Sequence, residues 1–306
     1  GGDMRYNSAG EYFKRRFGCK VYRLAVAGGV SCPNRDGVCG EGGCIFCAEG
    51  SGGFVPSESD INSELERAKR LVEAKCRSGS YIAYFQSYTA TYGDPERLES
   101  RLLTAARRDD IAAVSVATRP DCLGPDVMGV LAKAAEIKPL IVELGLQTAS
   151  DETARFINRG YPTDVYTSAC GRLHSVGAEA IAHVMLGLPH ESEREMLATI
   201  DLVNATADGV KLQLTHVLEG TRLAGLYRSG EYRPLELDEY VTLLAACVRR
   251  LDERVVIHRL TGDGDKRLLL APEWSADKKR VLNRIRSEFE RLDVVQGSAR
   301  AGQSAE

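Results

Sequence analysis

The stretch SCPNRDGVCGEGGCIFC, residues 31–47, holds four of the nine cysteines of this 306-residue chain. They are Cys32, Cys39, Cys44 and Cys47, with the spacing C-x6-C-x4-C-x2-C. An apolar run at residues 21–26, which predicts a β-strand, ends just before this stretch. Glycines among the cysteines allow the backbone to wrap closely around a bound group. Because thiolates suit zinc and iron–sulfur clusters, the stretch predicts a metal or cluster site.

The rest of the chain places this loop in an α/β fold. Short apolar runs predict strands at residues 21–26, 81–85, 111–117, 140–146, 179–186 and 209–214. Amphipathic patterns predict helices between them, at residues 60–78, 95–108, 126–136, 163–176 and 193–207. This alternation predicts parallel strands joined by helical crossovers, and it fits both a barrel and an open doubly wound sheet. In either fold the cysteine loop lies at the carboxyl end of the sheet, where barrel enzymes place their chemistry.

The pattern changes after residue 220, where helices are predicted at 236–250 and 277–292 and a strand at 255–260. We therefore divide the chain into four regions. Residues 1–10 are expected to be a tag remnant or flexible N-terminus, and residues 11–220 to form the main domain, with the cluster loop at 29–55. Residues 221–295 are expected to form a C-terminal extension that packs on it. The small, polar residues 296–306 are expected to be a disordered tail.

Composition limits the classes of protein to consider. Hydrophobic residues make up 43% and charged residues 27% of the chain, which excludes a disordered or collagen-like protein. No apolar run approaches the roughly 20 residues of a membrane helix, and no secretion signal begins the chain. An odd number of cysteines in a long chain without an export signal favours bound metal over disulfides. We expect a cytoplasmic protein with no membrane association.

Three chemistries fit the cysteines. Four thiolates can hold a structural zinc ion, in a nucleic-acid or protein-binding module without catalysis. Four thiolates can also hold an iron–sulfur cluster in an electron-transfer protein, since C-x4-C-x2-C occurs in plant-type ferredoxins. Finally, Cys32, Cys44 and Cys47 can hold a [4Fe–4S] cluster that leaves one iron open to a ligand. An open position is typical of a catalytic metal site.

Several further motifs recur in order along the chain. They are CPNRDG at 32–37, GGCIFC at 42–47, YFQSYTATY at 84–92, TRPDC at 118–122, ELGLQT at 143–148, RG at 159–160, HVMLGLP at 183–189 and HRLTGDG at 258–264. With these motifs the chain resembles radical S-adenosylmethionine (SAM) enzymes of the YhcC/YtqA type, over roughly residues 10 to 290. This type is related to the Elongator catalytic subunit, which modifies wobble uridine in tRNA. Two departures from the family pattern are the additional Cys39 and Ala90, which stands where an asparagine is expected.

The resemblance implies a partial (β/α)6 barrel of TIM type with a C-terminal α/β extension. It implies two cofactors, SAM and a [4Fe–4S] cluster on Cys32, Cys44 and Cys47. It also implies SAM contacts at the ends of the strands. Gln86, Ser87 and Tyr88 are expected near the SAM amino group, and Thr118 and Arg119 near its ribose or carboxylate. The other expected contacts are Gln147 (ribose or substrate), Arg159 (carboxylate), and Phe46, Leu186 and Leu188 (adenine).

Candidates for substrate contact follow the later strands of the predicted barrel. They are Lys211, Gln213, His216 and His258. The resemblance favours an enzyme that acts on the 5-substituent of wobble uridine in tRNA. With a net charge of −3, local basic clusters such as residues 14–16 and 278–280 would have to hold the phosphates. Expected partners are tRNA, a reductase, flavodoxin or ferredoxin as electron donor, and a partner methyltransferase.

Overall fold

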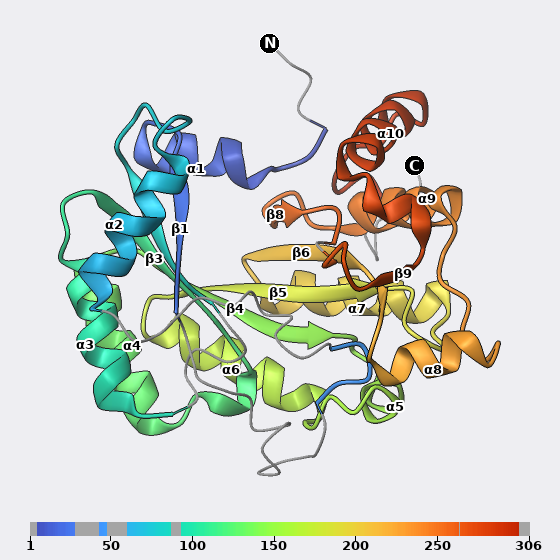
Figure 1. Cartoon of the computed structure of the whole chain (residues 1–306), viewed down its shortest axis with the longest axis horizontal. Coiled ribbons are helices and arrows are strands. Elements are labelled where there is room, and N and C mark those ends of the chain that lie inside the picture. Colours follow the sequence, from blue (N-terminus) through green and yellow to red (C-terminus); the bar gives the residue numbers. More distant parts are fainter. Residues whose placement is uncertain (1–4, 28–42, 48–59, 87–92, 263, 300–306) are drawn as a thin grey trace.

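The computed structural model describes residues 5–27, 43–47, 60–86, 93–262 and 264–299. Its main feature is a parallel sheet of seven strands whose spatial order follows the chain. The strands are β1 (Tyr22–Ala27), β2 (Tyr81–Gln86), β3 (Ile111–Thr118), β4 (Leu140–Gln147), β5 (Glu179–Leu186), β6 (Gly209–Leu214) and β8 (Val256–Arg259). The sheet curls into a half-barrel (Figure 1). The predicted partial barrel is therefore confirmed, and the open doubly wound sheet is excluded.

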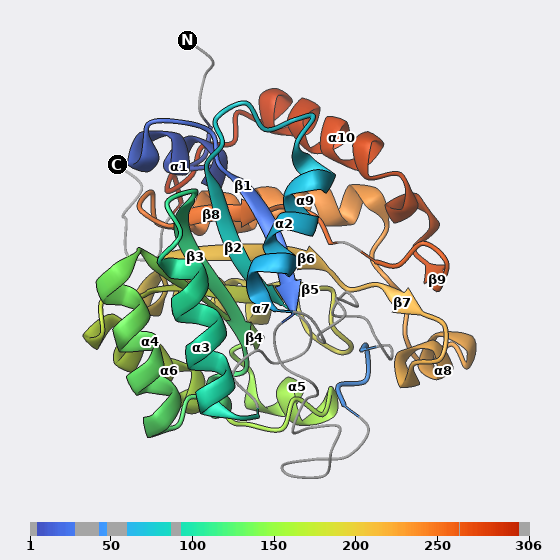
Figure 2. The same ribbon diagram turned by 60° about the vertical axis from the view of Figure 1, so that its left-hand side comes forward.

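Crossover helices cover the outer side of the sheet, as Figure 2 shows for α2, α3, α4 and α6. They are α2 (Ile61–Val72), α3 (Pro95–Ala106), α4 (Pro125–Ile137), α6 (Thr163–Ser175), α7 (Glu193–Thr206) and α9 (Leu237–Arg250). Local sequence fixes their starts: the Asp94 side chain accepts a hydrogen bond from the Glu96 amide, and Pro95 occupies the first turn of α3. Outward side chains such as Val142, Leu144 and Leu146 of β4 pack in the main core with these helices. The alternate residues of each strand face the barrel interior.

Helix α1 (Ala9–Phe17), which the sequence reading did not predict, closes the amino end of the barrel. Its Phe13 is buried and packs against one side chain from each of β2, β3, β4 and β5. These are Ile82, Ala113, Ile141 and Ile181. Within the described part of the chain, this apolar plug closes the inner space at the amino ends of the strands, so we expect a ligand to enter from the carboxyl ends.

The predicted boundaries at the two ends of the chain need correction. Asn7 is held in place, because the Ile257 amide donates to its carbonyl (2.7 Å) and its own amide donates to the Gln296 side chain (2.7 Å). Gln296 is itself buried and donates to two main-chain carbonyls near β8. The described parts of the supposed flexible N-terminus and disordered tail thus pack together beside β8. That strand, assigned to the extension from the sequence, is the seventh strand of the barrel.

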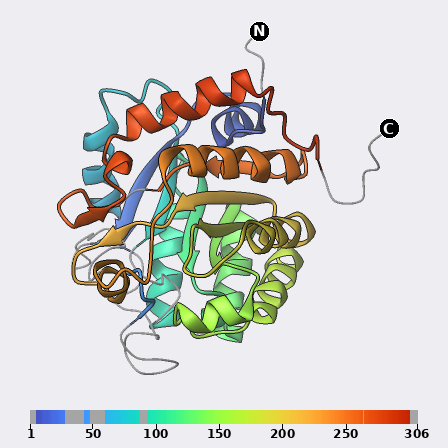
Figure 3. The ribbon, with the colours of Figure 1, turned by 90° about the vertical axis from the view of Figure 1, so that its right-hand side faces the viewer.

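The chain after β6 adds a second, small sheet and the helices α8 and α10 to the barrel. Strands β7 (Val217–Leu218) and β9 (Leu269–Ala271) pair antiparallel. Helices α8 (Arg222–Arg228) and α5 (Asp151–Phe156) flank residues 43–47, drawn in blue in Figure 1. Helix α10 (Lys278–Arg291) lies beside α9 (Figure 3). None of the helices in the described parts of the chain is long and apolar enough to cross a membrane.

Candidate functional site

A ring of polar side chains lies inside the barrel, above the apolar plug. Its members come from six different strands, and we call them the lumen ring: Arg23, Tyr84, Glu143, His183, Lys211 and His258. The interior of an ordinary TIM barrel is filled by Val, Ile and Leu instead. Burying polar groups costs free energy unless they are paired. This departure marks the lumen as a functional site.

Glu143 lies at the centre of the lumen ring. Its Oε1 is 2.5 Å from Nζ of Lys211, and its Oε2 accepts a hydrogen bond from the Tyr84 hydroxyl at 2.5 Å. Nε2 of His183 lies 3.3 Å from the same Oε2 atom. Nδ1 of His183 is in turn 3.4 Å from the side-chain nitrogen of Gln213, one step closer to the mouth of the barrel. Glu143 thereby fixes three side chains around the inner space.

Electrostatics keeps the central pair ionised. Burial alone would raise the pKa of Glu143, but Lys211, His183 and Arg23 hold it well below its usual value. Burial lowers the pKa of Lys211 to about 8, although Glu143 opposes that shift. Burial and the adjacent Glu143 raise the pKa of Tyr84. At neutral pH the ring therefore contains a carboxylate, an ammonium group and a neutral phenol.

One histidine of the lumen ring retains hydrogen-bonding capacity. Among the described residues, both ring nitrogens of His258 are buried without a hydrogen-bond partner, whereas Nε2 of His183 faces the Glu143 carboxylate at 3.3 Å. Burial lowers the pKa of His258 to about 3, with Arg23 acting in the same direction, so its imidazole is neutral. Unpaired buried polar atoms are uncommon and are filled in practice by water or a ligand.

Nearer the mouth, Gln147 has a conformation that suits ligand binding. It ends β4 with φ of +58°, a left-handed conformation that costs free energy for a residue other than glycine. Its Oε1 is buried without a partner. The side chain folds back over Gly145, where an added Cβ would come within 2.9 Å of Nε2 of Gln147. The Oε1 atom of Gln147 is thus an acceptor without a donor, and the side chain needs a glycine at position 145 to adopt this position. Both features fit the predicted contact with SAM or substrate.

Arg119, Tyr161 and Arg159 form a stack beside the mouth. The guanidinium carbons of Arg119 and Arg159 lie 4.9 and 4.6 Å from the centre of the Tyr161 ring. Arg119 also pairs with both oxygens of Asp121, at 2.9 and 2.8 Å. The Arg159 guanidinium also lies within electrostatic range of Cys44. The stack therefore places positive charge beside the cysteine segment.

The predicted role of Arg159 needs correction. Its side chain is only 1% exposed and donates to the carbonyls of Leu146, Thr148 and Tyr161 and to the hydroxyl of Thr163. These bonds use the donors of the guanidinium on the protein itself. We therefore assign Arg159 to holding the loop after β4 in place, and not to binding a SAM carboxylate.

Of the three predicted adenine contacts, one lies on the outer side of the sheet and two lie near the mouth of the barrel. Leu186 faces outward and packs in the main core with the helices, so it cannot line the inner space. Met185, the preceding residue, faces inward. Leu188 and Phe46 both belong to a smaller apolar cluster at the mouth, which is consistent with the prediction for them. The prediction for Leu186 is wrong because successive side chains of a strand point to opposite faces of the sheet.

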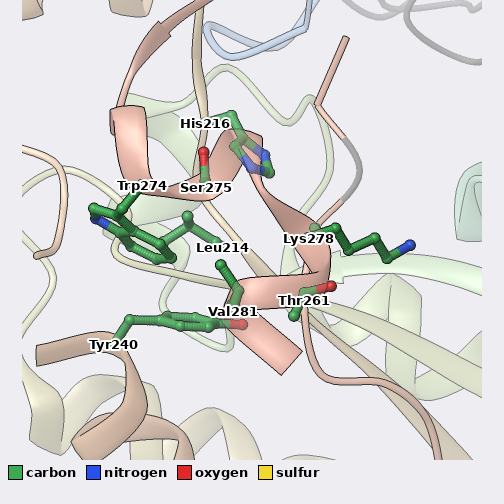
Figure 4. Close-up of a pocket in the computed structure, with 9 residues that line it drawn as sticks. Leu214, His216, Tyr240, Thr261, Trp274, Ser275, Lys278 and Val281 are labelled. Atoms are coloured by element: carbon green, nitrogen blue, oxygen red, sulfur yellow. The ribbon is translucent and has the colours of Figure 1, made fainter. Parts of the chain in front are cut away.

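His216 also lies elsewhere than predicted. Its ring packs against the loop after β8: a Cβ at Gly262 would come within 2.5 Å of the ring, and one at Gly264 within 3.1 Å. The adjacent cavity has Trp274 and Tyr240 on one side and Thr261 and Lys278 on the other (Figure 4). Its volume of about 10 Å³ holds at most about one water molecule. This position argues against substrate contact for His216 and indicates a role in joining two loops.

Four other predicted residues lie at strand ends or face the lumen, and their roles stay predictions. Gln86 ends β2 at the carboxyl edge of the sheet, Thr118 is buried at the end of β3, and Gln213 and Lys211 face the lumen. Cys32, Cys39, Ser87 and Tyr88 lie outside the described residues. Sequence reasoning missed Arg23, Tyr84, Glu143 and Tyr161 as site residues. A charged residue in the middle of an apolar strand, as at Glu143, is the signal that could have identified the ring.

The described part of the cysteine loop fits a bound cluster. The amide of Cys47 donates to the carbonyl of Cys44 at 3.1 Å, which closes a turn and brings the two cysteines together. Both side chains are partly accessible. Thiolate ligands in a turn next to arginine charge suit an iron–sulfur cluster, whose thiolate ligands are anionic.

Two family models match the chain: the Radical SAM superfamily over residues 34–203 and the Radical_SAM C-terminal domain over residues 207–291. YtqA of Bacillus subtilis is 37% identical over 298 residues, which are 96% of this chain and 92% of that protein. YhcC of Escherichia coli is 34% identical over 274 residues, covering 89% of this chain and 88% of YhcC.

More distant proteins also match. The solved structure of the archaeal Elp3 from Methanocaldococcus infernus has a TM-score of 0.69 and 16% identity, over 90% of this chain and 64% of that one. A tRNA uridine(34) acetyltransferase of Methanocaldococcus jannaschii is 27% identical over 48% of this chain and 27% of its own length. The family uses a [4Fe–4S] cluster and SAM, as the motifs predicted, and this decides among the three readings of the cysteines. The chain belongs to the radical SAM superfamily, and within it to the group that includes YtqA and YhcC.

Proposed function

We propose that this protein is a radical SAM enzyme that modifies the 5-substituent of wobble uridine in tRNA. The observation that carries the proposal is the lumen ring. A barrel interior that is sealed at one end and polar at the other can receive a small polar group on a longer substrate. A substituted base inserted from the carboxyl end would reach it.

Cys32, Cys44 and Cys47 would hold the cluster, and Gln86, Thr118, Arg119, Gln147 and Leu188 would contact SAM. When bound, cluster and SAM together supply a 5′-deoxyadenosyl radical that abstracts hydrogen from the substrate. The protein's own part is to bind, orient and exclude water. Gln147, at the mouth, would orient SAM, and its buried Oε1, which has no hydrogen-bond partner among the described residues, supports this role.

Deeper in the barrel, Lys211, Gln213 and His183 would orient the substrate group. Glu143 positions Lys211 and Tyr84, so that the lumen presents ammonium, imidazole and amide donors in fixed directions. Two cations, Arg23 and Lys211, against one carboxylate give the ring a net positive charge. Fixed polar groups of this kind support specificity, because a substrate that cannot pair with them leaves them unsatisfied.

The support for tRNA is the similarity to the uridine(34) acetyltransferase over about half of this chain. A basic segment of the extension, residues 278–280, begins α10 and would contribute phosphate contacts. Electron supply from a reductase, flavodoxin or ferredoxin and cooperation with a methyltransferase are part of the same proposal.

The test is mass spectrometry of tRNA nucleosides from cells with and without the gene. We expect one 5-substituted wobble uridine to accumulate and its successor to disappear in the deletion strain. Complementation with the wild-type gene should restore the pattern, whereas a Cys44→Ala gene should not. Unchanged wobble nucleosides would refute tRNA as the substrate.

A further inference from the structure

We propose that the C-terminal extension is part of the iron–sulfur site: Arg222 and Leu223 of α8, together with Asn158, position the turn that carries Cys44 and Cys47. The proposal rests on membership in the radical SAM superfamily and does not depend on the identity of the substrate.

The main chain of the turn is held from two sides. The amide of Ile45 donates to the carbonyl of Ile157 (3.0 Å), in the loop after α5. The carbonyl of Ile45 accepts from the amide of Leu223 (2.9 Å), in the first turn of α8. Ile45, one of the two residues between the cysteines, is thus bonded to the barrel through its amide and to the extension through its carbonyl.

The carbonyl of Gly43, just before Cys44, accepts two further hydrogen bonds. One comes from Nδ2 of Asn158 at 2.9 Å and the other from the guanidinium of Arg222. These two residues are distant from Gly43 in sequence and belong to different elements. Charged donors such as Arg222 form stronger hydrogen bonds than neutral ones. Asn158 has φ of +57°, a conformation that asparagine tolerates better than most residues.

Apolar contacts reinforce the same arrangement. Ile45 is buried in a cluster that joins the barrel to the extension. From the barrel come Ile157 and Leu188, and from the extension Leu223, Ala224, Tyr232 and Ala271. The Tyr232 hydroxyl also donates to the Gly187 carbonyl at 2.6 Å, which ties the extension to the loop after β5. The turn therefore packs between the barrel and the extension, which are also bonded to each other.

This arrangement matters for the cluster because only three cysteines hold it, so misplacing one of them weakens its binding. Residues that orient metal ligands without touching the metal contribute about 10- to 100-fold to metal affinity. Among the described residues, Ile157, Asn158, Arg222 and Leu223 hold the turn with two of the three predicted ligands, and all four lie outside the cysteine loop. Loss of the hydrogen bonds from Arg222 or Asn158 to the turn should therefore weaken cluster retention while the barrel stays folded.

The experiment compares cluster retention in wild type and four variants of the full-length chain, the fourth being the conservative Arg222→Lys. Arg222→Ala removes the charged donor, and Asn158→Gly removes the amide while glycine keeps the left-handed conformation. Arg228→Ala is the matched control, since Arg228 lies in the same helix but pairs with Glu219 on the surface. Each protein is reconstituted anaerobically with iron and sulfide, then challenged with a ferrous chelator. The rate of cluster loss and the EPR spectrum of the reduced cluster are recorded.

We expect Arg222→Ala and Asn158→Gly each to lose the cluster about tenfold faster than wild type, with an altered EPR spectrum. Arg228→Ala should match wild type, and Arg222→Lys should recover part of the loss. Circular dichroism checks that each variant is folded. If Arg222→Ala or Asn158→Gly is misfolded, the result for the other variant tests the proposal. Wild-type cluster retention and spectrum in folded Arg222→Ala and Asn158→Gly would overturn the proposal. Failure of the tRNA assay would leave it standing, since no substrate is involved.

Discussion

Nζ of Lys211 lies 2.5 Å from Oε1 of Glu143, and both side chains are almost completely buried inside the barrel. Desolvating two charges costs several kcal/mol per ion, and their attraction recovers this only with good geometry and further hydrogen bonds. Tyr84 and His183 supply those neighbours around Glu143. Such a pair gives little net stability compared with an apolar core, which is why we attribute it to function.

Glu143→Gln should destabilise the fold strongly, by about 3–5 kcal/mol, because it leaves the Lys211 ammonium buried without its counter-ion. Urea unfolding measures the change. The double variant Glu143→Gln with Lys211→Met should recover much of the loss. Asp238→Asn, which breaks the exposed pair with Arg284, is the control and should cost under about 1 kcal/mol. Additive losses in the double variant would show that the two residues are not coupled.

Gly145→Ala should weaken SAM binding, since a Cβ at this position would come within 2.9 Å of Nε2 of Gln147 and displace that side chain. We expect an increase in the SAM dissociation constant of about tenfold, the equivalent of one hydrogen bond. Gln147→Ala should have a similar effect, and the two changes combined should not be additive. Equilibrium dialysis with the reconstituted protein measures binding. Wild-type affinity in both variants would remove Gln147 from the SAM site.

His258 should make the fold sensitive to acid. Its pKa is lowered to about 3 in the folded chain, mainly by burial, whereas the unfolded chain has an ordinary histidine pKa near 6.5. Between these values the unfolded state binds more protons, so stability falls as the pH decreases, by about 1.4 kcal/mol per pH unit. Urea unfolding of wild type and His258→Leu at pH 6 and pH 5 should differ in slope accordingly. Parallel pH profiles would show that His258 accepts a proton in the folded state.

Gly262→Ala should destabilise the chain, because a Cβ there would come within 2.5 Å of the His216 ring. A loss of about 1–3 kcal/mol in thermal or urea unfolding is expected for such overpacking. Combining it with His216→Ala should recover most of the loss. Gly171→Ala in α6, where a Cβ meets nothing, is the control and should be neutral or stabilising. An unchanged stability in Gly262→Ala would exclude a tight contact between the two loops.

The sequence predicted the six strands β1 to β6 and their crossover helices, because apolar runs and amphipathic spacing are local signals. It did not predict α1 as the plug, since a short helix reveals its partner only through tertiary contacts such as Phe13 with Ile181. The positions of Asn7 and Gln296 were also missed, because polar residues at chain ends resemble flexible tails unless their hydrogen bonds are known.

Motifs correctly marked the strand ends at Gln86, Thr118 and Gln147, whose contacts with SAM stay predictions. The prediction failed for Leu186. The motif correctly marked the end of β5, but the alternation of side chains along the strand turns Met185, and not Leu186, to the inner face. The prediction failed for Arg159 because sequence does not reveal that main-chain carbonyls occupy the guanidinium. The lumen ring combines residues from six strands, and only folding brings them together.

The most direct test of the account is reductive cleavage of SAM by the anaerobically reconstituted protein. We predict about four iron atoms per chain, as a [4Fe–4S] cluster requires, and formation of 5′-deoxyadenosine when dithionite is added. Replacement of Cys32, Cys44 or Cys47 by alanine should abolish both, whereas Cys39→Ala should retain both. Stoichiometric zinc with no cluster and no 5′-deoxyadenosine, or loss of the cluster in Cys39→Ala, would contradict the account.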